Sequence, residues 1–200
     1  GGAPDDGAGV LGDQFGASVA LQGGTILVGA PAADSSLGSD VGTTYSFVLQ
    51  PGGWLPQGQI VPSDAVAGRR FGTSVDLDQN RALIDGYVFT RSSGAWTQTQ
   101  KLRNTVTGVD LSPDGAVVVD RLDRNYRGVI DVFQGGEAQL LTKDTSLALQ
   151  AANGGASNDL FGHSVALLDE DRFVIGAPGD SLLDGYRHGS ASIMKWHGDT

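Results

Sequence analysis

The chain of 200 residues contains no cysteine, so it can form no disulfide, no thiolate nucleophile and no cysteine-ligated metal site. It has no run of 18 apolar residues, which a membrane-spanning helix would need. Basic residues are scarce, with 13 Lys and Arg against 23 Asp and Glu and a formal net charge of −10. Because this charge repels phosphate backbones and anionic lipids, we predict no nucleic-acid partner and no membrane insertion.

A helical period is also missing, because glycine interrupts every window long enough to hold a helix. Glycine itself is abundant, with 31 residues, about twice the usual share. Many glycines between short apolar runs indicate many tight turns and therefore many short strands. The chain starts with Gly rather than Met, and we expect it to be a piece of a longer protein.

One phrase repeats along the chain. The stretches "FGASV", "FGTSV" and "FGHSV" end at Val19, Val75 and Val165, and the degenerate copy "VTGVDLSPDGAVVV" has its equivalent valine at Val109. The steps between these valines, in chain order, are 56, 34 and 56 residues. Steps of this size, with one short, are typical of β-propeller blades.

Each copy predicts four strands. An alternating apolar run is followed by a short turn and then by a continuous apolar run such as "TILVGA" or "RFVIGA", which we expect to be buried on both faces. A polar fourth run begins at Trp54 in the first copy and at Trp96 in the second. The third run holds a large side chain at one place in every copy, namely Phe47, Phe89, Phe133 and Met194.

Four strands with a polar last strand are the layout of a propeller blade. We therefore predict an all-β fold, a β-propeller of four-stranded antiparallel blades in a single region over residues 1–200. The blade units are residues 14–62, 70–103, 104–150 and 160–200. The last unit ends after its third strand, so we expect these four units to be part of a larger propeller.

The repeated phrase resembles the FG-GAP repeat, named for Phe-Gly and Gly-Ala-Pro and found in the propeller of integrin α-subunits and in many bacterial exported proteins. The resemblance implies about seven blades and an extracellular, cell-surface or periplasmic location. The residues that carry the resemblance are Phe15, Gly16, Gly29, Ala30, Pro31, Phe71, Gly72, Phe161, Gly162, Gly176, Ala177 and Pro178.

We expect the Phe of each copy to pack between adjacent blades, and the Pro to end the second strand because it cannot donate a hydrogen bond to the sheet. In the second copy, "ALIDGYVF" replaces the long loop after Gly-Ala-Pro and predicts a two-residue hairpin at Asp85-Gly86.

The resemblance also implies that Ca²⁺ is possible in the hairpins, where oxygen ligands at alternate positions suit this cation. The chain departs from the integrin pattern, because its hairpins are short and lack the final carboxylate. Ordinary turns supported by Asp are the alternative that we favour. The candidate ligands are Asp76, Asp78 and Asn80, then Asp110, Ser112 and Asp114, and, in the loops after Gly-Ala-Pro, Asp34, Asp40, Asp180 and Asp184.

No Gly-x-Ser-x-Gly elbow and no phosphate-binding loop before a helix is present, so we predict no enzyme. We expect a non-enzymatic interaction or adhesion module that binds a protein or a glycan through its loops. One alternative is a scaffold or accessory subunit of a larger assembly. Another is a lectin that uses Trp54, Trp96 or Trp196.

Overall fold

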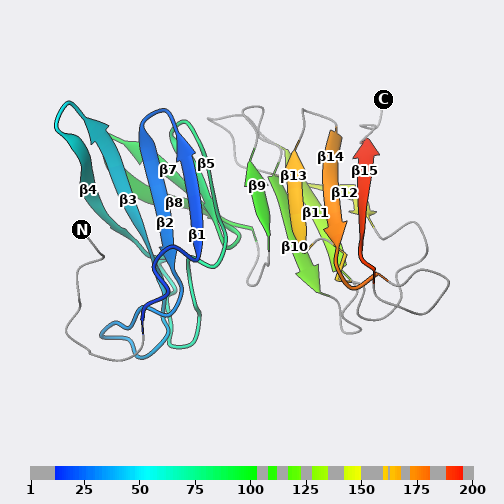
Figure 1. Cartoon of the computed structure of the whole chain (residues 1–200), viewed down its shortest axis with the longest axis horizontal. Helices are drawn as coiled ribbons and strands as arrows, with labels where there is room; N and C mark the ends of the chain where they lie inside the picture. The colour runs from blue at the N-terminus through cyan, green and yellow to red at the C-terminus, as the bar shows by residue number, and fades with distance from the viewer. Residues whose placement is uncertain are drawn as a thin grey trace. The chain divides into compact units, whose positions relative to one another are not determined.

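The computed structural model describes residues 12–102, 108–111, 117–122, 128–134, 142–149, 160–161, 163–167, 172–180 and 188–195 (Figure 1). Every helix or strand in these ranges is a β-strand. Across the same ranges no helix has the length and apolarity that a membrane span requires. The chain falls into two compact units, Gly1–Lys101 and Leu102–Thr200, which are described separately.

The first unit begins with an antiparallel sheet of four strands in sequence order, here called the first blade. A Gly23-Gly24 turn, with φ of 55° and 77°, joins its first two strands. The strands are β1 (Ser18–Gln22), β2 (Thr25–Ala30), β3 (Thr43–Gln50) and β4 (Gly53–Ile60).

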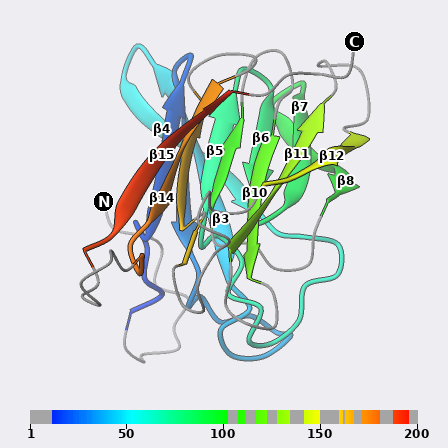
Figure 2. The same ribbon diagram turned by 90° about the vertical axis from the view of Figure 1, so that its right-hand side faces the viewer.

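A second four-stranded sheet, the second blade, has the same order (Figure 2). The predicted hairpin at Asp85-Gly86 is confirmed, since Ile84 pairs with Tyr87 and the two turn residues have φ of 46° and 82°. The strands are β5 (Val75–Asp78), β6 (Arg81–Ile84), β7 (Tyr87–Ser92) and β8 (Ala95–Lys101).

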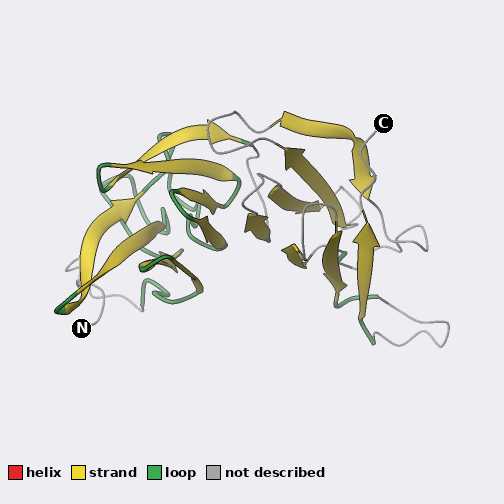
Figure 3. Cartoon of the chain, turned by 90° about the horizontal axis from the view of Figure 1, so that it is seen from above, coloured by secondary structure: helices red, strands yellow, loops and turns green. Residues whose placement is uncertain are grey.

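The second unit holds a four-stranded and a three-stranded antiparallel sheet, the third and last blades. Figure 3 shows the described elements as strands and loops. The third blade consists of β9 (Val109–Leu111), β10 (Val117–Leu122), β11 (Gly128–Gln134) and β12 (Thr142–Leu149). The last blade consists of β13 (Ser164–Leu167), β14 (Arg172–Ala177) and β15 (Ser190–Lys195). The prediction of an all-β fold built from four-stranded antiparallel propeller blades is confirmed.

The second strands of the blades differ in burial. As expected, β2 and β6 are buried over nearly their whole length. In β14, by contrast, burial alternates, and the expectation of burial on both faces is wrong there. Phe173 and Ile175 pack against Val132 and Phe161, whereas the opposite face, which includes Val174, is only half-buried.

Adjacent blades within the first unit pack face to face. Leu27 and Ile60 of the first blade form one apolar cluster with Val75 and Leu77 of β5. Because side chains alternate along a strand, each blade has two faces. We call the face that carries Val75 and Leu77 the leading face of the second blade, and the face that carries Leu27 the trailing face of the first blade.

Candidate functional site

The Phe of Phe-Gly lies just before the first strand in the first, second and last blades. Phe71 is fully buried, and its ring lies edge-on to Tyr87 and Phe89, with centroids 5.8 and 6.0 Å away. It belongs to the cluster that contains Leu27 and Ile60, so its side chain lies between the two blades of the first unit.

The other two Phe of the repeat lie at the same place in their own blades. Phe15 packs edge-on to Tyr45 at 5.4 Å and to Phe47 at 6.4 Å, and it is partly exposed. Phe161 is buried in the second unit in a cluster with Val132 and Phe173. Gly162 lies outside the described residues.

Gly29 lies at a close approach between the two blades of the first unit. A Cβ atom at Gly29 would lie 1.9 Å from the carbonyl oxygen of Gly72 and 2.3 Å from Oγ of Ser18. Gly72 has a φ of 95°, and a Cβ there would lie 2.6 Å from the carbonyl oxygen of Thr43. Both glycines therefore permit a close backbone approach that a larger residue would block.

The last blade repeats part of this geometry. A Cβ at Gly176 would lie 2.3 Å from Oγ of Ser164, its partner across the strand pair. β2 ends at Ala30 and β14 at Ala177, in each case directly before the Pro of the motif, which are Pro31 and Pro178.

Asp85 occupies, in the second blade, the position that Gly29 holds in the first. Its carboxylate accepts hydrogen bonds from the backbone N–H groups of Gly72, Thr73 and Ser74, with the last two at 3.0 and 2.8 Å. Burial raises the pKa of Asp85 to about 6, while these backbone donors act in the opposite direction. In the first blade the acceptor is a backbone group instead of a carboxylate. The N–H of Gly16, the Gly of Phe-Gly there, donates to the carbonyl oxygen of Gly29.

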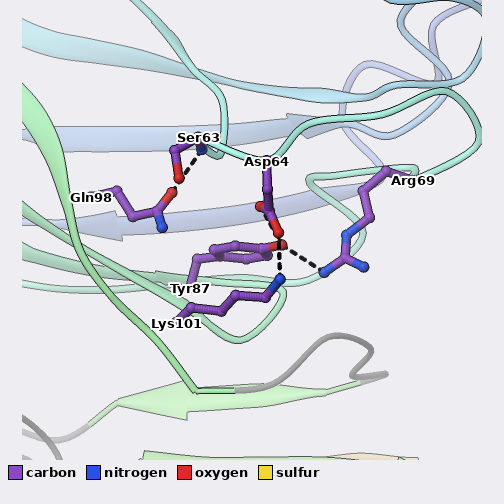
Figure 4. Close-up of polar contacts among 6 residues, drawn as sticks. All are labelled: Ser63, Asp64, Arg69, Tyr87, Gln98 and Lys101. Carbon is purple, nitrogen blue, oxygen red and sulfur yellow. Dashed lines mark hydrogen bonds and ion pairs between the residues drawn. The ribbon is translucent and has the colours of Figure 1, made fainter.

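A polar cluster ties the segment between the blades to the second blade (Figure 4). Nη2 of Arg69 donates to the hydroxyl of Tyr87 at 2.8 Å, and that hydroxyl donates to Oδ1 of Asp64 at 2.8 Å. Nζ of Lys101 pairs with Oδ2 of Asp64. The two cations also lie 5.3 and 5.1 Å from the centre of the Tyr87 ring.

The electrostatics of this cluster hold Asp64, Lys101 and Tyr87 in their ordinary protonation states. Hydrogen bonds from Lys101 and Tyr87 lower the pKa of Asp64, and Asp64 raises the pKa of Lys101. Burial, followed by the bond to Asp64, raises the pKa of Tyr87, so the phenol keeps its proton. A carboxylate, an ammonium and a neutral phenol that hold one another suit a structural clamp better than acid–base catalysis.

The loop after Gly-Ala-Pro in the first blade borders a hollow of about 400 Å³. The loop folds back on itself, because Ser35 and Gly38 exchange backbone hydrogen bonds of 3.1 and 3.0 Å. Leu37 and Val61 are exposed apolar residues in its lining. Polar groups in the lining come from Asp34, Ser35, Ser36, Thr43, Tyr45 and Gln59.

Two of the candidate calcium ligands lie in this loop, where both are already engaged. Oδ1 of Asp34 accepts the backbone N–H of Asp40 at 2.9 Å, which is an Asx-type turn contact. The carboxylate of Asp40 lies 3.7 Å from Nη1 of Arg70.

The candidate calcium ligands of the hairpin in the second blade each make a different contact. Oδ1 of Asp78 accepts Nε2 of Gln22 at 2.9 Å, whereas Asn80 uses its backbone carbonyl for the N–H of Arg91. Asp76 is half-buried on β5. The described residues contain no group of three or more His, Cys, Asp or Glu placed to hold a metal ion.

In the second unit, the carboxylate of Asp110 accepts the N–H groups of Leu111 and Leu167, and thereby links the third blade to the last. Asp180 makes backbone bonds to Ala177 and Gly189 at 3.1 Å. Ser112, Asp114 and Asp184 lie outside the described residues. Calcium binding therefore stays a prediction.

Two tryptophans of the lectin alternative lie on the outer strands. Nε1 of Trp96 donates to Oγ of Ser46 at 3.0 Å, across the blade boundary, and its ring packs on the core of the first unit. Trp54 is exposed on β4, and Trp196 lies outside the described residues.

Sequence reasoning missed the buried carboxylate and the clamp. Asp85 carried a signal, since it stands where the repeat has Gly. The contact between Tyr87 and Asp64 has no local signal in the sequence, because the two residues are 23 positions apart and meet only when the blades have folded.

Comparison with known proteins agrees with this geometry. The FG-GAP repeat family matches residues 3–47 and 149–194, which include both complete copies of the motif. These two segments are FG-GAP repeats. Ser18 and Gly29, which meet Gly72 of the second blade, both lie in the first matched segment. No curated protein matches the chain.

A solved structure shares the fold of these blades. A crystal structure of the N-terminal domain of Nup159 is 14% identical, with a TM-score of 0.52, over 90% of this chain and 44% of that chain. A structure from S. cerevisiae with Dbp5 bound to Nup159, Gle1, IP6 and ADP is 15% identical, with a TM-score of 0.48. The match covers 88% of this chain and 46% of that chain. The chain spans less than half the length of these structures. At 14% identity, the likeness to the N-terminal domain of Nup159 shows the propeller fold alone.

Proposed function

We propose that this FG-GAP chain is a non-enzymatic interaction module that acts outside the cytoplasm, at the cell surface, in the periplasm or in the medium. The hollow beside the loop after Gly-Ala-Pro carries the proposal, because a concave site with an apolar rim and a few polar groups is typical of recognition. The location rests on the resemblance to exported FG-GAP proteins.

We propose a protein ligand that inserts an apolar side chain into this hollow. Leu37 and Val61 offer exposed apolar surface, and the polar lining, which includes Ser36 and Gln59, can meet a peptide backbone. A sugar ring favours an open aromatic face, but the aromatic residue of this lining, Tyr45, is buried. These features support a protein ligand over a glycan.

The test is a selection of peptides from a displayed random library with the immobilised chain as bait. Ala65 lines the hollow and is half-buried, so Ala65→Trp fills it. Ala95 is exposed on β8 and is absent from the lining, so Ala95→Trp is the matched control. We expect the selected peptides to bind the native chain and the Ala95→Trp variant, and to bind the Ala65→Trp variant at least about tenfold more weakly.

Two results contradict this proposal. Peptides that bind the Ala65→Trp variant as well as the native chain would place recognition elsewhere. Binding to an immobilised glycan array, with no peptide selected, would favour the lectin alternative instead.

A further inference from the structure

A second hollow, here called the interblade pocket, lies between the trailing face of the first blade and the leading face of the second, next to their first hairpin turns. Its volume is about 400 Å³, and small-molecule sites typically measure about 300–1,000 Å³. Both of its walls belong to the first unit, and it shares no lining residue with the hollow beside the loop after Gly-Ala-Pro. The lining consists of Gln22, Gly23, Thr25 and Val48 from the first blade and Gln79, Asn80 and Arg91 from the second.

The contact between the two blades changes from apolar to polar toward this pocket. Leu77 and Phe89 of the second blade belong to the apolar cluster that also holds Leu27 of the first. Two positions further along the chain stand Gln79, in the turn after β5, and Arg91, on the same face of β7 as Phe89. Long polar side chains therefore border the space where the apolar contact ends.

Arg91 is held in place by its neighbours. Its Nη1 donates to Oγ1 of Thr25 at 2.6 Å, and its guanidinium carbon lies 5.9 Å from the centre of the Trp96 ring. A guanidinium carries several N–H donors, and within the part of the chain that the structure describes only Thr25 accepts one of them. The other donors are available to a ligand, and binding costs little ordering because the side chain is already fixed.

Two side-chain amides of the lining are also available. Gln22 is fully engaged, since its Nε2 donates to Oδ1 of Asp78 at 2.9 Å and its Oε1 accepts the backbone N–H of Gln79. The side-chain amides of Gln79 and Asn80, by contrast, make no hydrogen bond to any described residue and are exposed. Each of them offers both donors and an acceptor, as a hydroxyl group does.

The pocket carries a single positive charge. Among the described residues that line it, Arg91 is the one with a charged side chain. Next to it, Asp78 and Arg81 pair in register and are only 1% and 3% exposed, so an acid and a base are buried together there. A carboxylate matches both the charge and the planar shape of a guanidinium, whereas a doubly charged phosphate would find no second cation in this lining.

We propose that the interblade pocket binds the carboxylate of a small hydroxylated ligand, such as a sugar acid. Arg91 binds the carboxylate, and the amides of Gln79 and Asn80 bind hydroxyl groups. Val48 is the one apolar side chain in the lining, so a plain hydrocarbon acid would gain little from it. This site does not depend on the proposed peptide recognition.

The test is a titration of the ¹⁵N-labelled chain with D-glucuronate at pH 7, followed by NMR. Glucose is the matched ligand, because it has a hydroxymethyl group where glucuronate has its carboxylate. We expect glucuronate to bind with a dissociation constant of about 1 mM, ordinary for so small a ligand, and glucose to bind at least about tenfold more weakly. The Nε–H signal of Arg91 should shift together with the backbone signals of Gly23 and Asn80.

Arg91→Gln should raise the dissociation constant for glucuronate at least about tenfold, because it removes a charged hydrogen-bond donor. Arg70→Gln is the matched control, since it removes the same charge at a residue that contacts Gln14 and Asp40 and lies outside this lining. Asn80→Ala should weaken binding about threefold, and it leaves the backbone carbonyl that accepts the N–H of Arg91 in place. The NMR spectrum of each variant shows whether the blades are folded.

Several results would overturn the proposal. One is an absence of shifts around Arg91 with glucuronate up to about 50 mM. Another is equal binding of glucose and glucuronate, or equal binding of glucuronate by the Arg91→Gln and Arg70→Gln variants. Propionate that binds as tightly as glucuronate would show that a bare carboxylate, such as an acidic side chain of a protein, is sufficient. Tighter binding of inorganic phosphate would assign the pocket to a different anion.

Discussion

Oγ of Ser18 donates a 2.8 Å hydrogen bond to the carbonyl oxygen of Gly72, which lies 54 residues later in the chain. Gly29 pairs with Ser18 in the sheet and leaves the space that this carbonyl enters. The contact joins the Ser that follows one Phe-Gly, the Gly of Gly-Ala-Pro, and the Gly of the next Phe-Gly. It gives a physical reason for the spacing of the FG-GAP motif, since all three must be present where adjacent blades touch.

Gly29→Ala is expected to destabilise the chain by about 1–3 kcal/mol or more, because its Cβ would meet backbone that cannot rotate away. Gly52→Ala is the matched control, since a Cβ there has no neighbour within 4 Å, and it should change stability by no more than about 0.5 kcal/mol. Urea unfolding measures both. Similar losses in the two variants would contradict the close approach.

Asp85 should make stability depend on pH. Its pKa is about 6 in the folded chain and 3.8 in the reference state, so the folded chain holds this proton more tightly. The stabilisation is complete below pH 3.8 and is lost as the pH rises through 6. One pKa unit corresponds to about 1.4 kcal/mol, so the loss between pH 4 and pH 7 is about 2–3 kcal/mol.

The measurement is the free energy of unfolding of the native chain and of Asp85→Asn from pH 4 to pH 7. Subtracting the two curves removes the other carboxylates, which titrate in both proteins. We expect the stability of the native chain relative to the variant to fall as the pH rises. A flat difference would show that Asp85 titrates normally.

Tyr87→Phe should cost about 1–2 kcal/mol, because it removes a hydroxyl that bonds both Arg69 and Asp64. The partial exposure of these partners keeps the cost below that of a fully buried charged pair. Tyr45→Phe is the matched control and should cost about 0.5–1 kcal/mol, since the hydroxyl of Tyr45 accepts a neutral bond from Gln59. Urea unfolding at pH 7 compares them. Equal losses of unfolding free energy in the two variants would show that the hydroxyl of Tyr87 stabilises the fold no more than that of Tyr45.

Removal of calcium should leave the melting temperature unchanged. The carboxylates of Asp34 and Asp110 accept backbone N–H groups, which suits the turn alternative rather than a cation site. Thermal melting with excess EDTA and with added Ca²⁺ measures this. Since a ligand that binds only the folded state raises its stability, a higher melting temperature with Ca²⁺ would support the calcium prediction over the turn alternative.

The blades could be predicted from the sequence because their signals are local. Alternating runs, the Asp85-Gly86 turn and the aromatic at Phe47 or Phe89 lie within a few residues of the contacts that they specify. Strand order follows, since short turns join antiparallel neighbours. The Phe-Gly and Gly-Ala-Pro spacing then points to the family.

The candidate site could be predicted only in part. The loop after Gly-Ala-Pro was visible as a long segment with Asp34 and Asp40, but its hollow also needs Gln59 and Val61 from the far end of the blade. The N–H groups that Asp85 binds are 11 to 13 residues away, and they converge only after the second blade has formed.

The sequence by itself determined the strands, their antiparallel order and the repeat, since hydrophobic period and turn residues act over short distances. The tertiary structure alone decided which apolar faces are covered. Val19 and Val75 stand in the same local sequence, yet one is exposed and the other buried. The difference comes from the neighbouring blade, because burial depends on what packs against a face and not on the residue itself.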